Sequence, residues 1–170
     1  MTKFVALLRA INVGGTGKLP MKQLAVLCGD LGYENVRTYI QSGNAVFESI
    51  LSETAVRDAL AKALTRAMGK PADLVVRTAA DMRAVLKANP FPDKEGAKVA
   101  VAFLSGAMPR RALDDVVAPG GEDVRPGKGV VYIYYPDGMG RSKLKLSKAL
   151  GVVTVRNINT VGKLVEMMKG

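Results

Sequence analysis

The sequence contains no histidine and no tryptophan, and Cys28 is its single cysteine. Without histidine, the chain lacks the side chain that most often serves as a general base near neutral pH and as a metal ligand. Ser-His and Cys-His catalytic arrangements are therefore excluded. One cysteine cannot form an internal disulfide or a thiolate metal cage, and Cys28 lies among leucines at helical spacing. We expect a buried, unreactive thiol, no metal and no cofactor.

Long apolar runs are also missing. No stretch approaches the roughly 20 apolar residues that cross a bilayer. The apolar N-terminal segment lacks a small-residue cleavage site and is soon interrupted by Arg9. These absences predict a cytoplasmic protein with no membrane partner. The chain has 170 residues, 48% of them apolar, which is ample for a core in one large domain or two small ones.

Acidic residues are scarce relative to basic ones. The chain has 25 Lys and Arg residues against 15 Asp and Glu residues, a formal net charge of +10. This balance makes an anionic ligand or a nucleic acid a reasonable partner, although lysines on a solvated helix face would give the same count. From Val124 to the C-terminus, Asp137 and Glu166 stand against nine basic residues: Arg125, Lys128, Arg141, Lys143, Lys145, Lys148, Arg156, Lys163 and Lys169.

The first half of the chain alternates strand and helix signals. Residues 3–12 are apolar and rich in strand formers, and Pro20 suits the first position of the helix that follows. The segments NVRTYIQ and NAVFES, joined by a short Gly-containing turn, predict a β-hairpin. Ser52 is expected to cap a long helix that stops near Gly69, and ADLVVRTA to form a further strand. The resulting order is β-α-β-β-α-β.

The same order is expected again in the second half. A helix over residues 80–88 and the segment NPFPDKEG lead to a strand over residues 98–105. Helices are expected over residues 110–117 and 142–150, and strands at EDVRP, GVVYIYY and VVTVRN. Asn159 is expected to cap a terminal helix.

Two successive β-α-β-β-α-β units predict an α+β fold of two tandem ferredoxin-like modules with antiparallel sheets. The expected domains are residues 1–80 for the first module, 81–97 for a connecting helix and loop, and 98–170 for the second module with its C-terminal helix. Such a sheet carries its helices on one face, so the other face must be solvated, paired or used for binding.

Tyr132 and Tyr134 share one face of the strand GVVYIYY, because side chains alternate along a strand. The segment KGVVYIYY partly matches the aromatic strand of RNA-recognition modules, but Val130 and Val131 depart from that pattern. Base stacking on Tyr132 and Tyr134 is one interpretation. We favour the other, in which tyrosines close the interface between the two modules.

The Gly-rich stretch NVGGTGKLPM, residues 12–21, fits neither phosphate-binding motif. In a P-loop, Asn12 would be Gly and Leu19 would be Ser or Thr, and in the dinucleotide pattern Pro20 would be the third Gly. A weaker signal remains, because NVGGTGKLP, GMGRSKL and VRNINT would each place basic or polar donors at a helix start, which suits anions. Ordinary caps and turns are the alternative. The candidate anion-binding residues are Arg9, Asn12, Gly14, Gly15, Lys18, Arg141, Ser142, Lys143, Arg156 and Asn157.

Five blocks of sequence, ALLRAINVGGTGKLPM, VRTYIQSGNAVF, NPFP, YYPDGMGRSKL and TVRNINTV, occur in this order along nearly the whole chain. Together they resemble a bacterial domain-of-unknown-function family, number sixteen ninety-seven, which usually opens with LLRGINVGG. Ala10 stands where that family usually has Gly, and the Asn of RNIN is not followed by the aromatic residue that is common there. The resemblance implies an α+β fold of two ferredoxin-like parts, and it implies no activity.

The sequence therefore predicts a protein that binds an anionic ligand or nucleic acid at basic helix starts. A small-molecule enzyme acting on a phosphorylated or carboxylate substrate is an alternative. In it, Lys18 or Lys143 would stabilise negative charge while Asp137 or a tyrosine moves the proton. A third alternative is a protein-protein interaction module that pairs its open sheet faces.

Overall fold

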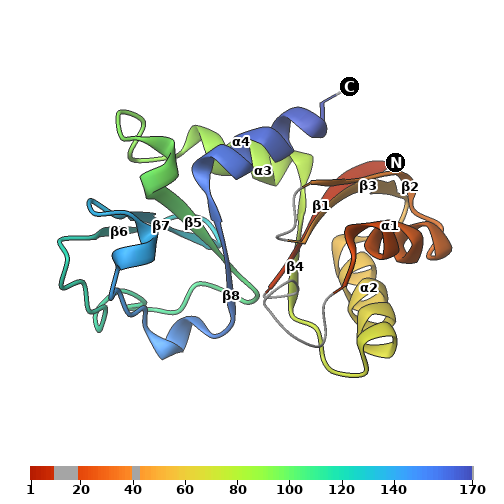
Figure 1. The fold of residues 1–170 in the computed structure, drawn as a ribbon, viewed down its shortest axis with the longest axis horizontal. Helices are drawn as coiled ribbons and strands as arrows, with labels where there is room; N and C mark the ends of the chain where they lie inside the picture. The colour runs from red at the N-terminus through yellow and green to blue at the C-terminus, as the bar shows by residue number, and fades with distance from the viewer. Residues whose placement is uncertain (10–18, 40–42, 170) are drawn as a thin grey trace. The chain divides into compact units, whose positions relative to one another are not determined.

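The computed structural model describes residues 1–9, 19–39 and 43–169 (Figure 1). The chain divides into two compact units, Met1–Met82 with Leu164–Gly170, and Arg83–Lys163. Each unit contains a four-stranded sheet in which all neighbouring strands are antiparallel. The predicted α+β class and the two tandem antiparallel sheets are confirmed.

The first sheet has the strand order β2-β3-β1-β4. Its strands are β1 (Thr2–Leu8), β2 (Glu34–Tyr39), β3 (Asn44–Ser49) and β4 (Leu74–Thr78). Helix α1 (Met21–Asp30) comes between β1 and β2, and α2 (Glu53–Met68) comes between β3 and β4. Both helices lie on the same face of this sheet (Figure 1), where they cover its core.

The residues that begin and end the two helices can be compared with the capping residues predicted from the sequence. Ser52 caps α2 as predicted, because its side chain accepts a hydrogen bond from the Ala55 amide at 3.1 Å. Gly69 ends the helix in the left-handed conformation with φ of 71°, which glycine adopts without steric cost. Pro20 lies one position before the first helical residue of α1 instead of at that residue, and it has extended backbone angles.

Alternation along β1 explains why this strand is apolar without interruption. Phe4, Ala6 and Leu8 face the two helices and belong to the core, whereas Val5 and Leu7 point to the opposite face. All five side chains are buried. A strand that is buried on both faces has a continuous run of apolar residues in its sequence, and residues 4–8 of β1 form such a run.

The second sheet has the equivalent order β6-β7-β5-β8. Its strands are β5 (Val99–Leu104), β6 (Asp123–Pro126), β7 (Val130–Tyr134) and β8 (Val153–Asn157). Helix α3 (Ala79–Lys87) and the short 3-10 helix η1 (Gly96–Lys98) precede β5, and α4 (Ile158–Met167) follows β8. The strands expected in this half of the sequence are present.

Two helices predicted for the second half do not form. Residues 110–115 make hydrogen-bonded turns, and residues 142–147 are extended between two 3-10 helices, η2 (Met139–Arg141) and η3 (Lys148–Leu150). Prolines bracket the first segment closely, which leaves too short a stretch for a stable helix. The second segment alternates Lys and Leu with a period of two, which is the period of extended chain.

These irregular segments cover the second sheet in place of helices. The sheet contributes Ala100, Ala102 and Leu104 to a core cluster, with Val131, Ile133 and Tyr135 beside them. Ala112 and Leu150 complete the cluster, and Leu144 and Leu146 pack against it. The loop between β7 and β8 is therefore anchored by its leucines.

The start of α4 also differs from the prediction. Asn157, and not Asn159, caps this helix, because its side-chain oxygen accepts a hydrogen bond from the Thr160 amide at 2.8 Å. The helix consequently begins two residues earlier than expected, at Ile158.

Tyr132 provides a test of the second unit's packing. Its ring is buried, and its hydroxyl donates a hydrogen bond at 2.7 Å to the Val85 carbonyl in the last turn of α3. We expect Tyr132→Phe to lower the free energy of unfolding by about 1–3 kcal/mol, because the substitution leaves a buried carbonyl without its donor. Urea denaturation measures this loss. Tyr39→Phe is the matched control, since within the described residues the Tyr39 hydroxyl makes no hydrogen bond. Equal losses in both variants would contradict the assigned role.

Candidate functional site

The segment between η2 and η3 carries a row of positive charge, which we call the basic ridge and define as residues 141–148. Lys145 forms a β-bridge with Val117 through two backbone hydrogen bonds of 2.9 and 3.0 Å, and Leu144 and Leu146 pack against the core. Because successive side chains of an extended chain point to opposite sides, Lys143 and Lys145 face solvent together, about 6.6 Å apart. The exposed cations of the ridge are Arg141, Lys143, Lys145 and Lys148.

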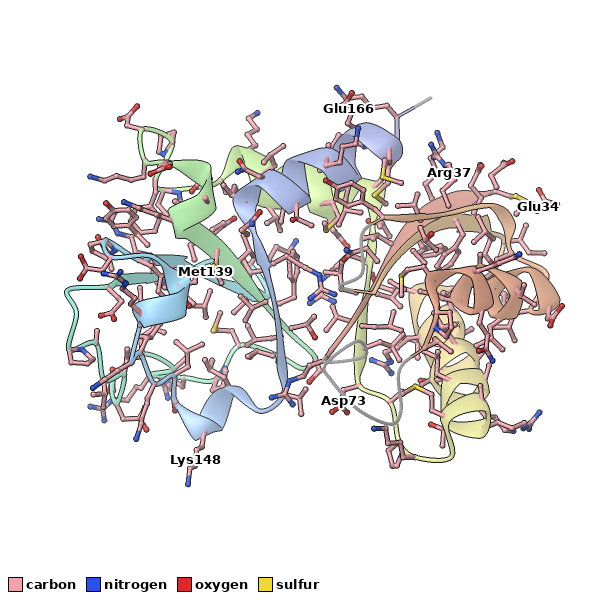
Figure 2. All side chains as sticks on the ribbon, viewed as in Figure 1. Glu34, Arg37, Asp73, Met139, Lys148 and Glu166 are labelled. Atoms are coloured by element: carbon pink, nitrogen blue, oxygen red, sulfur yellow. The ribbon has the colours of Figure 1, made fainter. Side chains whose placement is uncertain are left out.

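The basic ridge itself carries charge of one sign only. The segment contains no acidic residue. Among residues 1–9, 19–39 and 43–169, none of its four cations forms an ion pair. Lys148, at its end, extends away from the ribbon (Figure 2). The ridge is thus an exposed, unpaired stripe of cations, the type of surface that attracts polyanions.

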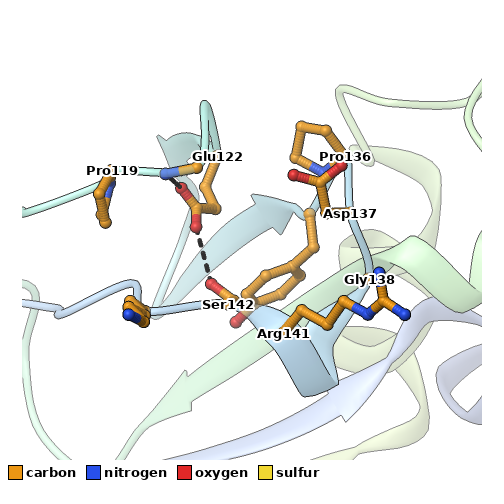
Figure 3. Close-up of a pocket in the computed structure, with 10 residues that line it drawn as sticks. Pro119, Glu122, Pro136, Asp137, Gly138, Arg141 and Ser142 are labelled. Atoms are coloured by element: carbon orange, nitrogen blue, oxygen red, sulfur yellow. Dashed lines mark hydrogen bonds between the residues drawn. The ribbon is translucent and has the colours of Figure 1, made fainter.

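A hollow of about 180 Å³ lies beside the ridge, and we call it the Tyr135 pocket (Figure 3). Its walls come from the loop before β6, the loop after β7 and the start of the ridge. The residues that line it are Pro119, Gly120, Glu122, Tyr135, Pro136, Asp137, Gly138, Arg141, Ser142 and Lys143. Arg141, Ser142 and Lys143 therefore belong both to the pocket and to the ridge.

Glu122 and Ser142 hold two of these segments together. The Ser142 hydroxyl donates to Glu122 Oε1 at 2.8 Å, and the Gly120 amide donates to Oε2 at 2.9 Å (Figure 3). The Ser142 oxygen also accepts from the Leu144 amide at 3.1 Å. The prediction that Ser142 caps a helix is therefore wrong, because Ser142 stabilises a turn and fixes the loop before β6 to the ridge.

The carboxyl of Glu122 gives a prediction for pH titration. Hydrogen bonds from its own backbone amide, from the Ser142 hydroxyl and from the Gly120 amide stabilise the charged form and lower its pKa below the ordinary value of 4.5. A depressed folded-state pKa means that the stabilisation is present above about pH 4.5 and is lost as the pH falls through the folded-state pKa. We expect NMR titration to give a value below 4.5, and Ser142→Ala to raise it. A value of 4.5 or more in the unsubstituted protein would contradict these contacts.

Tyr135 and Asp137 contribute different chemistry to the pocket. Tyr135 is buried, and burial together with the charge of Glu122 raises the pKa of its phenol. The phenol therefore stays protonated at neutral pH and can donate a hydrogen bond. Asp137 is exposed and accepts no hydrogen bond from another described residue. With two carboxylates and two cations in its walls, the pocket is close to neutral, unlike the ridge.

The other predicted anion-binding residues are not all testable. Asn12, Gly14, Gly15 and Lys18 lie outside the described residues, so their assignment stays a prediction. Arg9 is described, and its Nη1 lies 3.9 Å from Asp73 Oδ2 in a half-exposed ion pair.

Arg156 and Asn157 have structural roles in β8 and α4. Arg156 is only 8% exposed, and its Nη1 donates to the Val155 carbonyl at 3.0 Å. Burial lowers the pKa of this guanidinium to about 10. Val155 packs on the core face that Leu144 covers, so Arg156 points to the opposite face of the sheet. The structure therefore does not gather Arg156 and the basic ridge into one hollow.

The two candidate stacking residues differ in exposure. Tyr132 is 2% exposed with its hydroxyl bonded, so it offers no free face to a base. Tyr134 is half-buried, and its ring centroid lies 5.9 Å from that of Phe91 and 5.0 Å from the Lys94 ammonium. Of the two candidates, only Tyr134 remains available for base stacking, and its ring already contacts Phe91 and Lys94.

The sequence prediction omitted several residues that the structure places at the site. Lys145 and Lys148 belong to the basic count but not to the predicted anion-binding residues, and neither Glu122 nor Tyr135 is among the predicted site residues. The alternation Lys143-Leu144-Lys145-Leu146 was the available signal for a solvated basic edge. No sequence signal brings Glu122 to Ser142, which lies 20 residues away.

The described residues offer neither a metal-ligand cluster nor a membrane-spanning helix. In residues 1–9, 19–39 and 43–169, no three His, Cys, Asp or Glu side chains gather in a group that could hold a metal ion. In the same part of the chain, every helix is too short or too polar to span a membrane.

Comparison with known proteins identifies a family and a similar fold. The family described as "Protein of unknown function (DUF1697)" matches residues 1–132, a range that ends before the basic ridge. None of the curated proteins matches the sequence. Among solved structures, the conserved bacterial protein SP0830 from Streptococcus pneumoniae is similar, with 24% sequence identity, a TM-score of 0.71 and 99% of each chain covered. At that identity, the likeness shows the fold alone.

Proposed function

Since this chain belongs to the DUF1697 family of proteins of unknown function, we propose from its own residues that it binds a polyanion along the basic ridge. The observation that carries the proposal is the set of four exposed cations on one anchored segment, with no ion pair among the described residues. Phosphates neutralised by such side chains release condensed counterions, which favours binding of nucleic acids.

The distribution of charge favours a polyanion over a single small anion. The cations extend along the segment from Arg141 to Lys148, so one phosphate would contact only some of them, whereas a chain of phosphates contacts all four. The adjacent pocket has the carboxylates of Glu122 and Asp137 beside two cations, so it gives a small anion little net attraction. Lysine ammoniums are flexible point charges and suit backbone contacts that do not depend on sequence.

The salt dependence of binding tests this proposal. A fluorescently labelled single-stranded oligonucleotide is titrated with the protein in a series of salt concentrations, and fluorescence anisotropy reports the affinity. Four phosphate contacts predict a slope of about −3 for log K against log salt, from roughly 0.7 per contact on a single strand. An oligonucleotide of equal length with an uncharged backbone is the control and should not bind. Absence of binding, or affinity independent of salt, would overturn the proposal.

A second candidate function is supported by one specific observation. The Tyr135 pocket brings together Asp137, Lys143 and a protonated tyrosine, which are the groups that an enzyme acting on a phosphorylated or carboxylate substrate would use. Lys143 would stabilise developing negative charge, and Asp137 would accept the proton. Turnover of a panel of phosphorylated and carboxylate metabolites, abolished by Asp137→Asn, would support this candidate. A panel without turnover would exclude it for those substrates.

For the architecture, we propose that each unit is a ferredoxin-like module. The order β2-β3-β1-β4, with α1 and α2 on one face, supports this for the first unit, and the equivalent order β6-β7-β5-β8 supports it for the second. The second unit departs from the pattern, because irregular segments replace both helices. Domain limits of 1–80 and 98–170, joined by 81–97, remain our proposal, and a cytoplasmic location stays a prediction.

A further inference from the structure

We propose that the Tyr135 pocket recognises the exocyclic amino group of a nucleobase, cytosine above all, in a single strand whose phosphates lie on the basic ridge. This inference rests on the proposed function. It adds sequence preference to a backbone interaction that by itself has none.

The first step is the shared position of the pocket and the ridge. Arg141 and Lys143 line the pocket and also belong to the ridge. A phosphate held by these two side chains therefore lies at the mouth of the pocket. The chemical group that is attached to this phosphate is therefore the one that can enter the Tyr135 pocket.

The second step concerns the polar groups inside. Ionised carboxylates only accept hydrogen bonds, and each has about four lone-pair sites. Glu122 accepts from Ser142, from Gly120 and from its own amide, which leaves part of its acceptor capacity, and the side chain of Asp137 accepts none from the described residues. The pocket consequently favours a neutral group that donates hydrogen bonds, and it disfavours a second phosphate or an acidic side chain.

The third step concerns the walls of the hollow, whose volume is about 180 Å³. Pro119, Pro136 and Tyr135 supply apolar surface in the walls.

A donor-bearing ring next to a phosphate is a nucleotide that carries an amino-substituted base. Cytosine has one ring and presents its N4 amino group, the known partner of Asp and Glu in base recognition. Thymine has one ring but an acceptor oxygen in the same place. An acidic polypeptide would supply charge for the ridge, but its carboxylates would meet those of Glu122 and Asp137.

The experiment compares oligo-dC with oligo-dT of equal length at neutral pH by anisotropy. We expect the protein to bind oligo-dC about tenfold more tightly, at the lower end of the range for one specific contact between a side chain and a base. Glu122→Gln and Asp137→Asn should each reduce this ratio towards one. Asp115→Asn is the matched control, because it removes an exposed carboxylate in the same unit outside the pocket and should leave the ratio unchanged.

The outcomes separate this inference from the proposed function. If both oligonucleotides bind equally with the expected salt dependence, the ridge binds phosphates and the base recognition is wrong. If neither binds, the proposed function itself fails. Competition by poly-glutamate as effective as that by oligo-dC would also overturn base recognition, because it would show a general polyanion surface. If the Glu122→Gln protein fails to fold, the Asp137→Asn protein still tests base recognition by the pocket.

Discussion

Replacing Lys143, Lys145 and Lys148 together by glutamine is expected to weaken single-strand binding about a hundredfold at about 0.1 M salt. Each phosphate contact on a single strand contributes roughly 0.7 to the slope of log K against log salt, which is about fivefold in affinity at this salt concentration relative to 1 M. Three lost contacts multiply to about a hundredfold, and the slope falls by about 2. The fold should persist, because all three side chains are exposed and the leucines between them keep their core contacts.

The control for this variant changes the same net charge elsewhere. Lys22, Lys62 and Lys70 are exposed lysines of the first unit. Their triple replacement by glutamine should change the affinity much less than the ridge variant does, because it removes no direct contact. An equal loss in both variants would mean that the total charge of the protein, and not the basic ridge, attracts the oligonucleotide.

Cys28 is expected to react with a thiol reagent about a thousandfold more slowly than an exposed cysteine at about pH 8. The residue is 0% exposed, and burial raises the pKa of its thiol from 9.0 to about 12. The thiolate is the reactive form, and its fraction falls tenfold for each unit by which the pKa rises. The raised pKa also means that the thiol's contribution to stability is present below about pH 9 and is lost as the pH rises towards 12.

Labelling with a chromogenic disulfide in native buffer and in denaturant measures the effect on Cys28. The denatured protein should react at the rate of a free thiol, while the native protein should react about a thousandfold more slowly because of the raised pKa of its thiol. Equal rates under both conditions would contradict the burial of α1 against the first sheet.

The elements that sequence analysis predicted correctly carry strong local signals. The strands of both sheets are apolar and bounded by polar or Gly-containing turns, and Ser52 and Gly69 bracket a helix with regular apolar spacing. The segment over residues 142–150 was wrongly predicted as a helix although its Lys-Leu alternation is that of extended chain. That alternation indicates an extended segment whose lysines lie in solvent.

The candidate site could not be derived in the same way, because it depends on contacts between distant segments. Glu122 and Ser142 lie 20 residues apart in the sequence, and their contact depends on how the loops that cover the second sheet are placed. Burial of Arg156 is likewise invisible in a sequence that shows only its charge, since its position on β8 turns it away from the core that Val155 joins. The charge count indicated that an anion could bind in the C-terminal half, but the fold decides which cations are available.

The location of the bound strand is the most direct test of the account. Backbone amide chemical shifts of isotopically labelled protein are followed by NMR as an unlabelled single-stranded oligonucleotide is added. The account predicts that the amides of residues 141–148 shift most, with the shifts reduced by added salt. Shifts confined to residues 1–82, or none at a concentration that saturates anisotropy, would contradict it.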